Sequence, residues 1–102
     1  MRSYEVMFIL RPDYTETERQ ETFTVLKNTL EKFGTKITSS KIWNEKKKLF
    51  FPLAIKGKGV KFNEGLYYLV EFESNPLEIQ KINAAYRINE NILRFMIIAK
   101  EQ

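Results

Sequence analysis

Apolar residues alternate with more polar ones in several stretches, and this period of two is typical of β-strands that bury one face. Residues 3–11 predict a first strand, a second strand region runs from 35 to 43, and residues 92–99 predict the last. The apolar positions on the side that we expect to face the core are Tyr4, Val6, Phe8 and Leu10, then Leu49, Phe51, Leu53 and Ile55, then Leu66, Tyr68, Val70 and Phe72 in a third strand, and finally Leu93, Phe95 and Ile97.

Two other stretches carry the signals of helices. The segment 15–18 (Thr-Glu-Thr-Glu) has the spacing of a capping box, and Gly34 is placed to end the helix. The segment 75–78 (Asn-Pro-Leu-Glu) supplies a cap and a proline for the first turn of a second helix. The apolar residues that follow at helical spacing are Phe23, Leu26, Leu30 and Phe33 in the first, and Ile79, Ile82 and Tyr86 in the second.

The predicted order β-α-β-β-α-β is typical of a ferredoxin-like split βαβ sandwich, an α+β fold. It has a four-stranded antiparallel sheet with two helices on one face. We expect it to occupy residues 1–102 as a single domain. The glycine- and lysine-rich segment from Lys56 to Gly65 predicts the loop of a long hairpin between two strands.

Strand parity leaves a second set of side chains on the sheet face away from the helices. Its apolar members are Met7, Ile9, Tyr67, Leu69, Met96 and Ile98, beside Glu5, Glu71 and Arg94. An uncovered apolar patch often marks a protein-binding surface, so we expect a partner protein there. Scattered exposed apolar residues are also common in ordinary proteins, and that interpretation stays open.

Composition excludes most catalytic chemistry. The chain has no cysteine and no histidine, which removes nucleophile–histidine pairs and the usual metal ligands, so we expect no metal, cofactor or catalytic residue. Gly57-Lys58-Gly59 lacks the upstream glycine of a P-loop. No apolar run reaches membrane-spanning length and no signal peptide is evident, so we expect no membrane partner and a cytosolic or equivalent organellar location.

Positive charge is concentrated in one block. Residues 41–61 hold seven lysines and one acid, Glu45, a balance of +6, while the rest of the chain holds ten basic and twelve acidic residues, a balance of −2. Such a block favours an anionic partner such as a phosphate backbone. Lysines on an edge strand also discourage aggregation, which is the simpler alternative.

An RNA-recognition motif would put stacking aromatics on its third strand, but the segment 64–71 (Glu-Gly-Leu-Tyr-Tyr-Leu-Val-Glu) does not fit that pattern. We therefore expect contacts with the RNA backbone and shape. Trp43 beside Lys46, Lys47 and Lys48 predicts either base stacking with phosphate contacts or a tryptophan that covers the sheet.

Three arginines are further candidates for phosphate contacts: Arg2, Arg87 and Arg94. The alternatives are structural: Arg94 would pair with Glu5 on the neighbouring strand, and Arg87 would favour a helix C-terminus.

Two other functions suit the same topology. A metabolite-sensing regulatory domain would usually be fused to an enzyme and carry a glycine turn at a ligand niche, which this chain lacks. An enzyme of acylphosphatase type needs a phosphate cradle after the first strand, where residues 11–13 (Arg-Pro-Asp) offer no glycine. We therefore expect a binding module with no small-molecule substrate.

The ends of the chain resemble a known family. Residues 1–12 (MRSYEVMFILRP) and 86–95 (YRINENILRF) resemble the two terminal segments of bacterial-type small-subunit ribosomal protein six, the S-six family, and 49–53 (LFFPL) resembles its Leu-Ala-Tyr-Pro-Ile strand. The chain departs from the family at 43–48 (WNEKKK), where the family has a glycine step and arginines, and its loop from Lys56 to Glu64 looks longer.

The resemblance implies a non-catalytic constituent of the small ribosomal subunit, bound to cytoplasmic or organellar ribosomes. It implies binding of small-subunit ribosomal RNA in the central domain, together with ribosomal protein eighteen of the small subunit. Arg2, Arg87 and Arg94 carry over as RNA or partner contacts, Tyr4 as a structural residue, and Lys46, Lys47 and Lys48 by charge alone.

Overall fold

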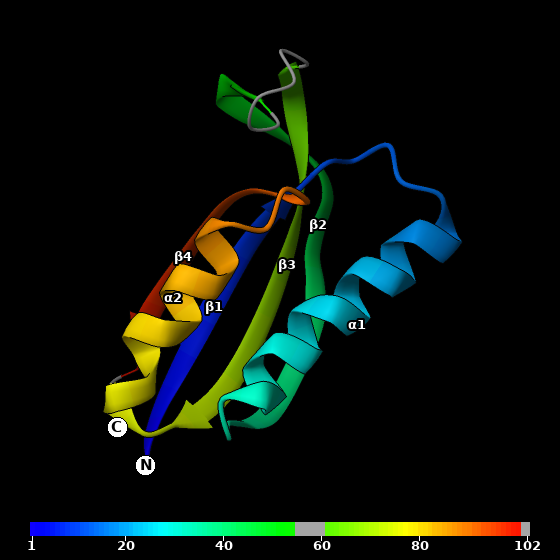
Figure 1. Cartoon of the computed structure of the whole chain (residues 1–102). Helices are drawn as coiled ribbons and strands as arrows, with labels where there is room; N and C mark the ends of the chain where they lie inside the picture. Colours follow the sequence, from blue (N-terminus) through cyan, green and yellow to red (C-terminus); the bar gives the residue numbers. More distant parts are fainter. Residues whose placement is uncertain (55–60, 101–102) are drawn as a thin grey trace.

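The computed structural model describes residues 1–54 and 61–100, and their elements follow the predicted βαββαβ order (Figure 1). The elements are β1 (Arg2–Leu10), α1 (Glu16–Lys32), β2 (Lys36–Ala54), β3 (Lys61–Ser74), a 3-10 turn η1 (Pro76–Glu78), α2 (Ile79–Arg87) and β4 (Ile92–Ala99). They form one four-stranded antiparallel sheet in the order β2-β3-β1-β4. The ferredoxin-like layout is therefore confirmed.

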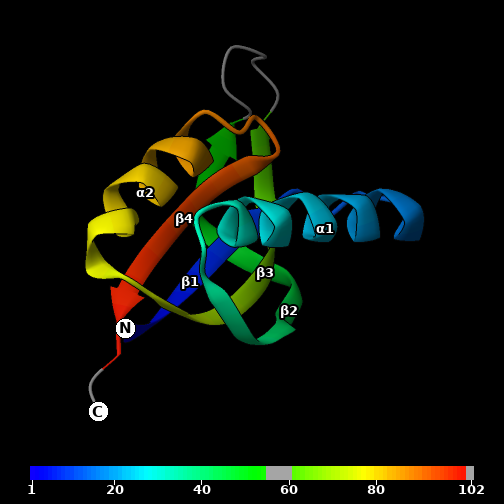
Figure 2. The ribbon, with the colours of Figure 1, turned by 60° about the horizontal axis from the view of Figure 1, so that its bottom comes forward.

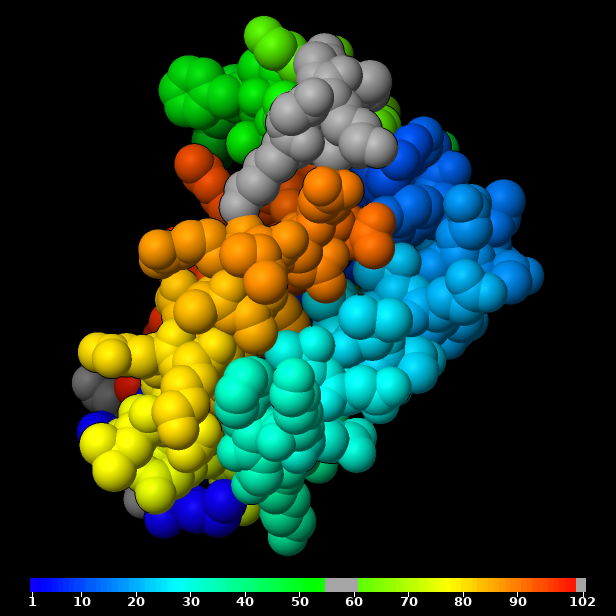
Figure 3. All heavy atoms as spheres, in the orientation of Figure 1, coloured from blue at the N-terminus to red at the C-terminus, as the bar shows by residue number. Residues whose placement is uncertain are grey.

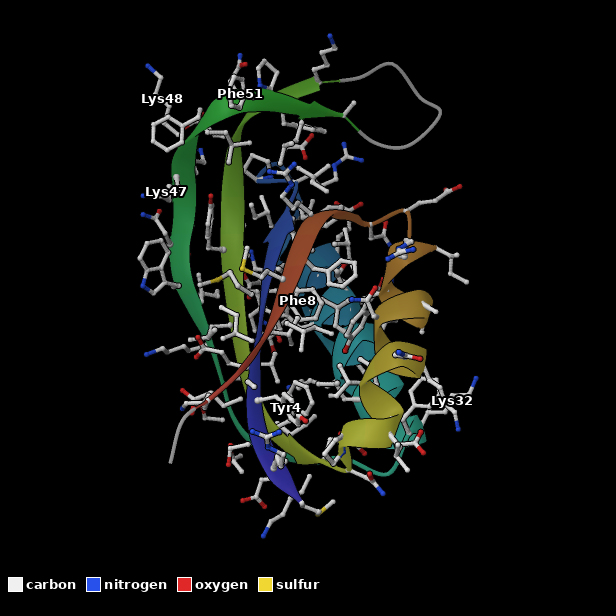
Figure 4. The ribbon with its side chains drawn as sticks, turned by 90° about the vertical axis from the view of Figure 1, so that its left-hand side faces the viewer. Tyr4, Phe8, Lys32, Lys47, Lys48 and Phe51 are labelled. Carbon is white, nitrogen blue, oxygen red and sulfur yellow. The ribbon has the colours of Figure 1, made fainter. Side chains whose placement is uncertain are left out.

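Both helices lie on the same face of the sheet, as Figures 1 and 3 show. The core lies between the two layers, and Figure 4 shows Tyr4 and Phe8 on the helix side of β1. Phe8 contacts Tyr86 of α2 edge to face, with ring centroids 4.8 Å apart, and Phe23 of α1 stacks on Tyr68 at 3.9 Å. These aromatic contacts join both helices to the two central strands.

Local sequence signals decide the helix ends. Thr15 accepts a hydrogen bond from the Glu18 amide while the Glu18 carboxylate accepts one from the Thr15 amide, so the predicted capping box is present. Gly34 follows α1 with a φ of 75°, a conformation that favours glycine. Asn75 accepts a hydrogen bond from the Leu77 amide and starts η1, which leads directly into α2.

β1 pairs with β3 without interruption from Arg2↔Ser74 to Leu10↔Leu66. It pairs with β4 on its other side, and the start of β1 lies beside the end of β4, where the Lys100 amide donates to the Ser3 carbonyl (Figure 2). A register shift next to Leu10 makes Ile92 the buried residue at the start of β4. The sequence predicts Leu93 there, and this prediction is wrong because strand parity does not include the shift.

β2 is much less regular than β1. Its pairing with β3 shifts register four times, between Ile37 and Ser39, Ile42 and Asn44, Asn44 and Lys47, and Lys48 and Leu53. After these shifts Leu49, Phe51 and Leu53 line a hollow together with Ile9 and Tyr67, which lie on the sheet face away from the helices. The prediction that these three residues lie under the helices is therefore wrong, and Ile55 lies outside the described residues.

The predicted loop from Lys56 to Gly65 is only partly tested. Residues 56–60 lie outside the described residues, but 61–65 are paired strand in β3, so the loop was placed too far along the chain. Residues 46–54 of β2 and 61–65 of β3 extend past Leu10, the last residue of β1. We call these two segments the hairpin arm; it is the upper part of Figure 1.

Candidate nucleic-acid interface

The predicted lysines lie on the hairpin arm. Lys46 and Lys48 are exposed and Lys47 is half-buried. Figure 4 shows Lys47 and Lys48 on the upper part of β2, whereas Lys32 lies on the other side of the molecule beside the helices. The Asn44 side chain accepts a hydrogen bond from the Lys46 amide at 3.1 Å and bridges one of the register shifts. The three lysine side chains therefore extend from a bent strand.

Glu45, the one acid in the 41–61 block, is engaged elsewhere. Arg19 of α1 donates a hydrogen bond to its carboxylate at 3.1 Å, and the same guanidinium lies 3.7 Å from Glu16. The Arg19 side chain is only 16% exposed, whereas that of Glu45 is 66% exposed, so the pair lies at the surface. The carboxylate of Glu45 is thus balanced by an arginine outside the block, and the charge of the neighbouring lysines is left for an outside anion.

Trp43 has features of both predicted roles, covering the sheet and offering a free ring surface for base stacking. Its ring contacts Tyr67 at 5.5 Å with planes tilted by 49°, and the Lys47 ammonium lies 5.2 Å from the ring centre. These contacts cover part of the sheet face, yet the tryptophan remains 50% exposed. Trp43 has a structural role here, and base stacking on its free surface stays a prediction.

The three arginines do not come together. Arg94 lies opposite Ile9 in the β1–β4 register, and Glu5 lies opposite Ile98, so the expected pairing of Arg94 with Glu5 is wrong. Arg94 lines the hollow beneath the hairpin arm, and it also shares a smaller hollow with Arg87. Arg2 lies opposite Ser74, at the far end of the sheet. Arg94 thus lies beside the hairpin arm and Arg87 lies beside Arg94, whereas Arg2 lies away from both.

The apolar side chains of the open sheet face line up across three strands. Ile9 lies between Tyr67 and Arg94, and Met7 lies between Leu69 and Met96. Met96 is 60% and Ile98 43% exposed, while Leu69 is buried. At the lower edge Lys100 donates a hydrogen bond to the Glu71 carboxylate at 2.7 Å and lowers its pKa. The predicted parity of this face is confirmed; its role in binding stays a prediction.

Sequence reasoning missed two residues of the hairpin arm. Phe50 is 100% and Phe51 77% exposed, although a strand alternation predicted Phe51 in the core. A signal was present: 49–53 (Leu-Phe-Phe-Pro-Leu) breaks the alternation and contains a proline, which cannot donate to a central strand ladder. Both observations indicate an irregular edge segment.

A single arginine contacts the base of the arm. Arg11, just after β1, donates two hydrogen bonds to the Asp13 carboxylate at 2.7 and 2.9 Å, and these lower the pKa of Asp13. Its guanidinium lies 5.2 Å from the centre of the Phe62 ring and 5.3 Å from that of Tyr14. These cation–π contacts connect the loop after β1 to the β3 side of the arm.

Within the described residues there is no cluster of three or more acidic side chains that could hold a metal ion. No helix among them is both long and apolar enough to cross a bilayer. The arrangement is that of a ferredoxin-like α+β protein with a lysine-bearing hairpin arm at one end and partly exposed apolar side chains, Met96 and Ile98, on the open sheet face.

Comparison with known proteins identifies the family. The family model described as "Ribosomal protein S6" matches residues 3–99, so the chain belongs to the ribosomal protein S6 family. It is 38% identical over 98 residues to small ribosomal subunit protein bS6 of Caldanaerobacter subterraneus subsp. tengcongensis, covering 96% of each chain. It is 35% identical over 102 residues to the bS6 protein of Thermoanaerobacter pseudethanolicus, covering 100% of both.

A solved structure is similar over nearly the same length. The crystal structure of 30S ribosomal protein S6 from Thermotoga maritima has a TM-score of 0.79 and 28% sequence identity, and covers 97% of this chain and 87% of that one. The chain is thus a bacterial-type protein of the small ribosomal subunit, which is bound to the ribosome. Its relatives are structural ribosomal proteins, a family not known to be enzymatic, as the sequence predicted.

Proposed function

We propose that this chain binds small-subunit ribosomal RNA through the hairpin arm and the two arginines beside it. The observation that carries the proposal is the set of cations at this end of the molecule: Lys46, Lys47 and Lys48 on β2, Arg94 in the hollow beneath the arm, and Arg87 beside Arg94. Lysine and arginine on a bent, protruding edge suit the phosphates of a folded RNA better than the bases of a single strand.

The number of phosphates sets the salt dependence. Arg2 lies at the other end of the sheet, so five of the six candidate cations belong to one contact. With roughly 0.7–0.9 counterions released per phosphate, five contacts correspond to a log–log salt slope near −4. Changing Lys46, Lys47 and Lys48 together to alanine removes three contacts, so the slope should become shallower by about 2 to 3.

The matched control is another triple variant. Lys32, Lys36 and Lys81 are exposed, and alanine at all three removes the same net charge away from the hairpin arm. This control should keep a slope near −4 for a central-domain RNA fragment. If the salt slope becomes equally shallow in both triple variants, RNA affinity depends only on the net charge of the protein, and the proposed interface is wrong.

We further propose that the open sheet face receives ribosomal protein eighteen and that the two proteins bind RNA together. Two exposed apolar side chains, Met96 and Ile98, support this, because the helices cover only the opposite face. Affinity for the RNA fragment should rise sharply when protein eighteen is added, and equal affinity with and without it would contradict joint binding.

A charge on this face should prevent that increase. In Met96→Glu the new carboxylate is solvated in the free protein, where Met96 is 60% exposed, but is desolvated at an interface. The control Val25→Glu replaces a residue of α1 that is 49% exposed on the helix side. Met96→Glu should lose the gain from protein eighteen, and Val25→Glu should retain it.

A further inference from the structure

The hairpin arm contains a large bulge next to its lysines. Lys48 pairs with Glu64 and Leu53 pairs with Phe62, so β2 advances five positions while β3 moves back two. The three additional residues on β2 lie within the segment 49–52, Leu-Phe-Phe-Pro. Bulges release side chains from the alternation of a strand and often re-aim them at binding sites.

The bulge presents aromatic rings that contribute little to the fold. Phe50 is 100% exposed and Phe51 is 77% exposed, and Figure 4 shows Phe51 at the top of β2 beyond Lys48. One exposed apolar residue needs no explanation. Here two consecutive phenylalanines line a hollow of about 210 Å³ together with Ile9 and Tyr67 of the open sheet face.

The charged side chain that lines this hollow is positive. Among the described residues that line it, Arg94 carries the only charge, and Lys46, Lys47 and Lys48 directly precede Leu49 in its wall. Of the two acids near these lysines, Glu45 is bound by Arg19, and Glu64 lies opposite Lys48 in the β2–β3 register. An apolar hollow with cations around its rim is complementary to a group that has a flat apolar face and an attached anion.

A nucleotide of RNA has that combination. Its base stacks on aromatic rings whatever its identity, and its phosphate pairs with lysine or arginine. We propose that the hollow beneath the hairpin arm, which we call the hairpin hollow, binds one unpaired base of the RNA. The base stacks on Phe50, the more exposed of the two rings, and the adjoining phosphates contact Arg94 and Lys48. This proposal rests on the proposed RNA-binding function and adds a base contact to the backbone contacts.

The experiment uses the full chain and two RNA hairpins. One carries a single bulged 2-aminopurine, and the other has the same stem without the bulge. The bulged hairpin should bind more tightly, and binding should change the 2-aminopurine fluorescence. Phe50→Ala should weaken binding of the bulged RNA by about fivefold to a hundredfold, the effect of losing one base–aromatic stack. Binding of the fully paired RNA should be unchanged.

Two further variants separate stacking from other effects. Phe50→Trp keeps an aromatic surface and should restore both affinity and the fluorescence change. Leu77→Ala removes another exposed apolar side chain, 79% exposed in η1 at the far end of the sheet, and should change neither. Since Phe50 is fully exposed, thermal melting of Phe50→Ala should match that of the unchanged protein.

The possible failures are distinguishable. If neither hairpin shows a salt slope that depends on Lys46, Lys47 and Lys48, the proposed RNA interface is wrong. If that slope is present but Phe50→Ala weakens both hairpins equally, the base site alone is overturned. If Phe50→Ala leaves binding of both RNAs unchanged, the base site is also overturned, and weaker binding of protein eighteen by this variant would then make the hairpin hollow a protein contact.

Discussion

Strands β2 and β3 run through both the four-stranded sheet and the hairpin arm, but the lower half of the sheet and the arm differ in what holds these strands. In the lower half β3 lies between β1 and β2, and Val70 and Phe72 are at most 1% exposed. In the arm the two strands pair only with each other, and Phe50 and Phe51 are open to solvent. Burial constrains Val70 and Phe72, whereas Phe50 and Phe51 can change with little loss of stability.

Two phenylalanines give the largest expected contrast between these regions. Phe8 is 0% exposed and contacts Tyr86, so Phe8→Ala should lower the free energy of unfolding by about 3–5 kcal/mol. Phe50→Ala, at a fully exposed position, should change it by no more than about 0.5 kcal/mol. Urea unfolding of both variants measures this, and a loss above about 1 kcal/mol for Phe50→Ala would mean that the arm is packed in solution.

Gly65, where the arm joins the sheet, should be nearly as sensitive. A Cβ added there would lie 2.5 Å from Cγ2 of Ile9, well inside normal contact distance. Gly65→Ala should therefore cost about 1–3 kcal/mol through overpacking. The double variant Gly65→Ala with Ile9→Ala, which removes the clashing group, should cost less than the sum of the two single changes in the same unfolding assay.

Tyr86 tests the body of the domain through pH. Its buried hydroxyl donates to the Leu26 carbonyl at 2.7 Å, and burial raises the pKa of the phenol above its usual value of 10. The contribution of the neutral Tyr86 side chain to the free energy of unfolding is thus fully present below pH 10. Above pH 10 it falls, because the unfolded state loses the proton first, by up to about 1.4 kcal/mol per pH unit. Tyr86→Phe should cost about 1 kcal/mol at neutral pH and show a smaller decline above pH 10 in chemical unfolding scans.

The smallest global effect is expected at Arg11. Its contacts with Asp13, Tyr14 and Phe62 are at the surface, so Arg11→Ala should lower the free energy of unfolding by about 1 kcal/mol or less. Its local effect should be larger, because Phe62 belongs to the arm. Hydrogen exchange at the amides of the hairpin arm should accelerate while exchange in β1 stays unchanged. Equal acceleration in both would mean that the arm and the sheet open together.

Local signals explain which predictions about the fold are correct. Thr15, Gly34 and Asn75 act through hydrogen bonds or backbone angles within a few residues, so the helix ends could be read from the sequence. The alternation of β1 was also reliable, because this strand pairs on both sides and its register with β3 has no shift. The open sheet face followed from the same parity.

The candidate site was less accessible to such reasoning. The basic block of 41–61 was evident as a composition, but its relation to Glu45 depends on Arg19, which is 26 residues away in the chain. The exposed position of Phe51 depends on a bulge that the alternation of Leu49, Phe51 and Leu53 concealed. The separation of Arg2 from Arg94 depends on the sheet order, which places them at opposite ends of neighbouring strands.

The sequence by itself determined the βαββαβ order, the core of β1, the helix caps, the absence of histidine and cysteine chemistry, and the location of the positive charge. These features depend on residue type and on periods of two or about four residues, and both are properties of short stretches of the chain. Tertiary structure decided the register of β2, the outward turn of Phe50 and Phe51, and the meeting of Arg94 with the hairpin arm. Those features depend on where β1 ends beside β3, because strands that continue past their neighbour lose the packing that enforces alternation.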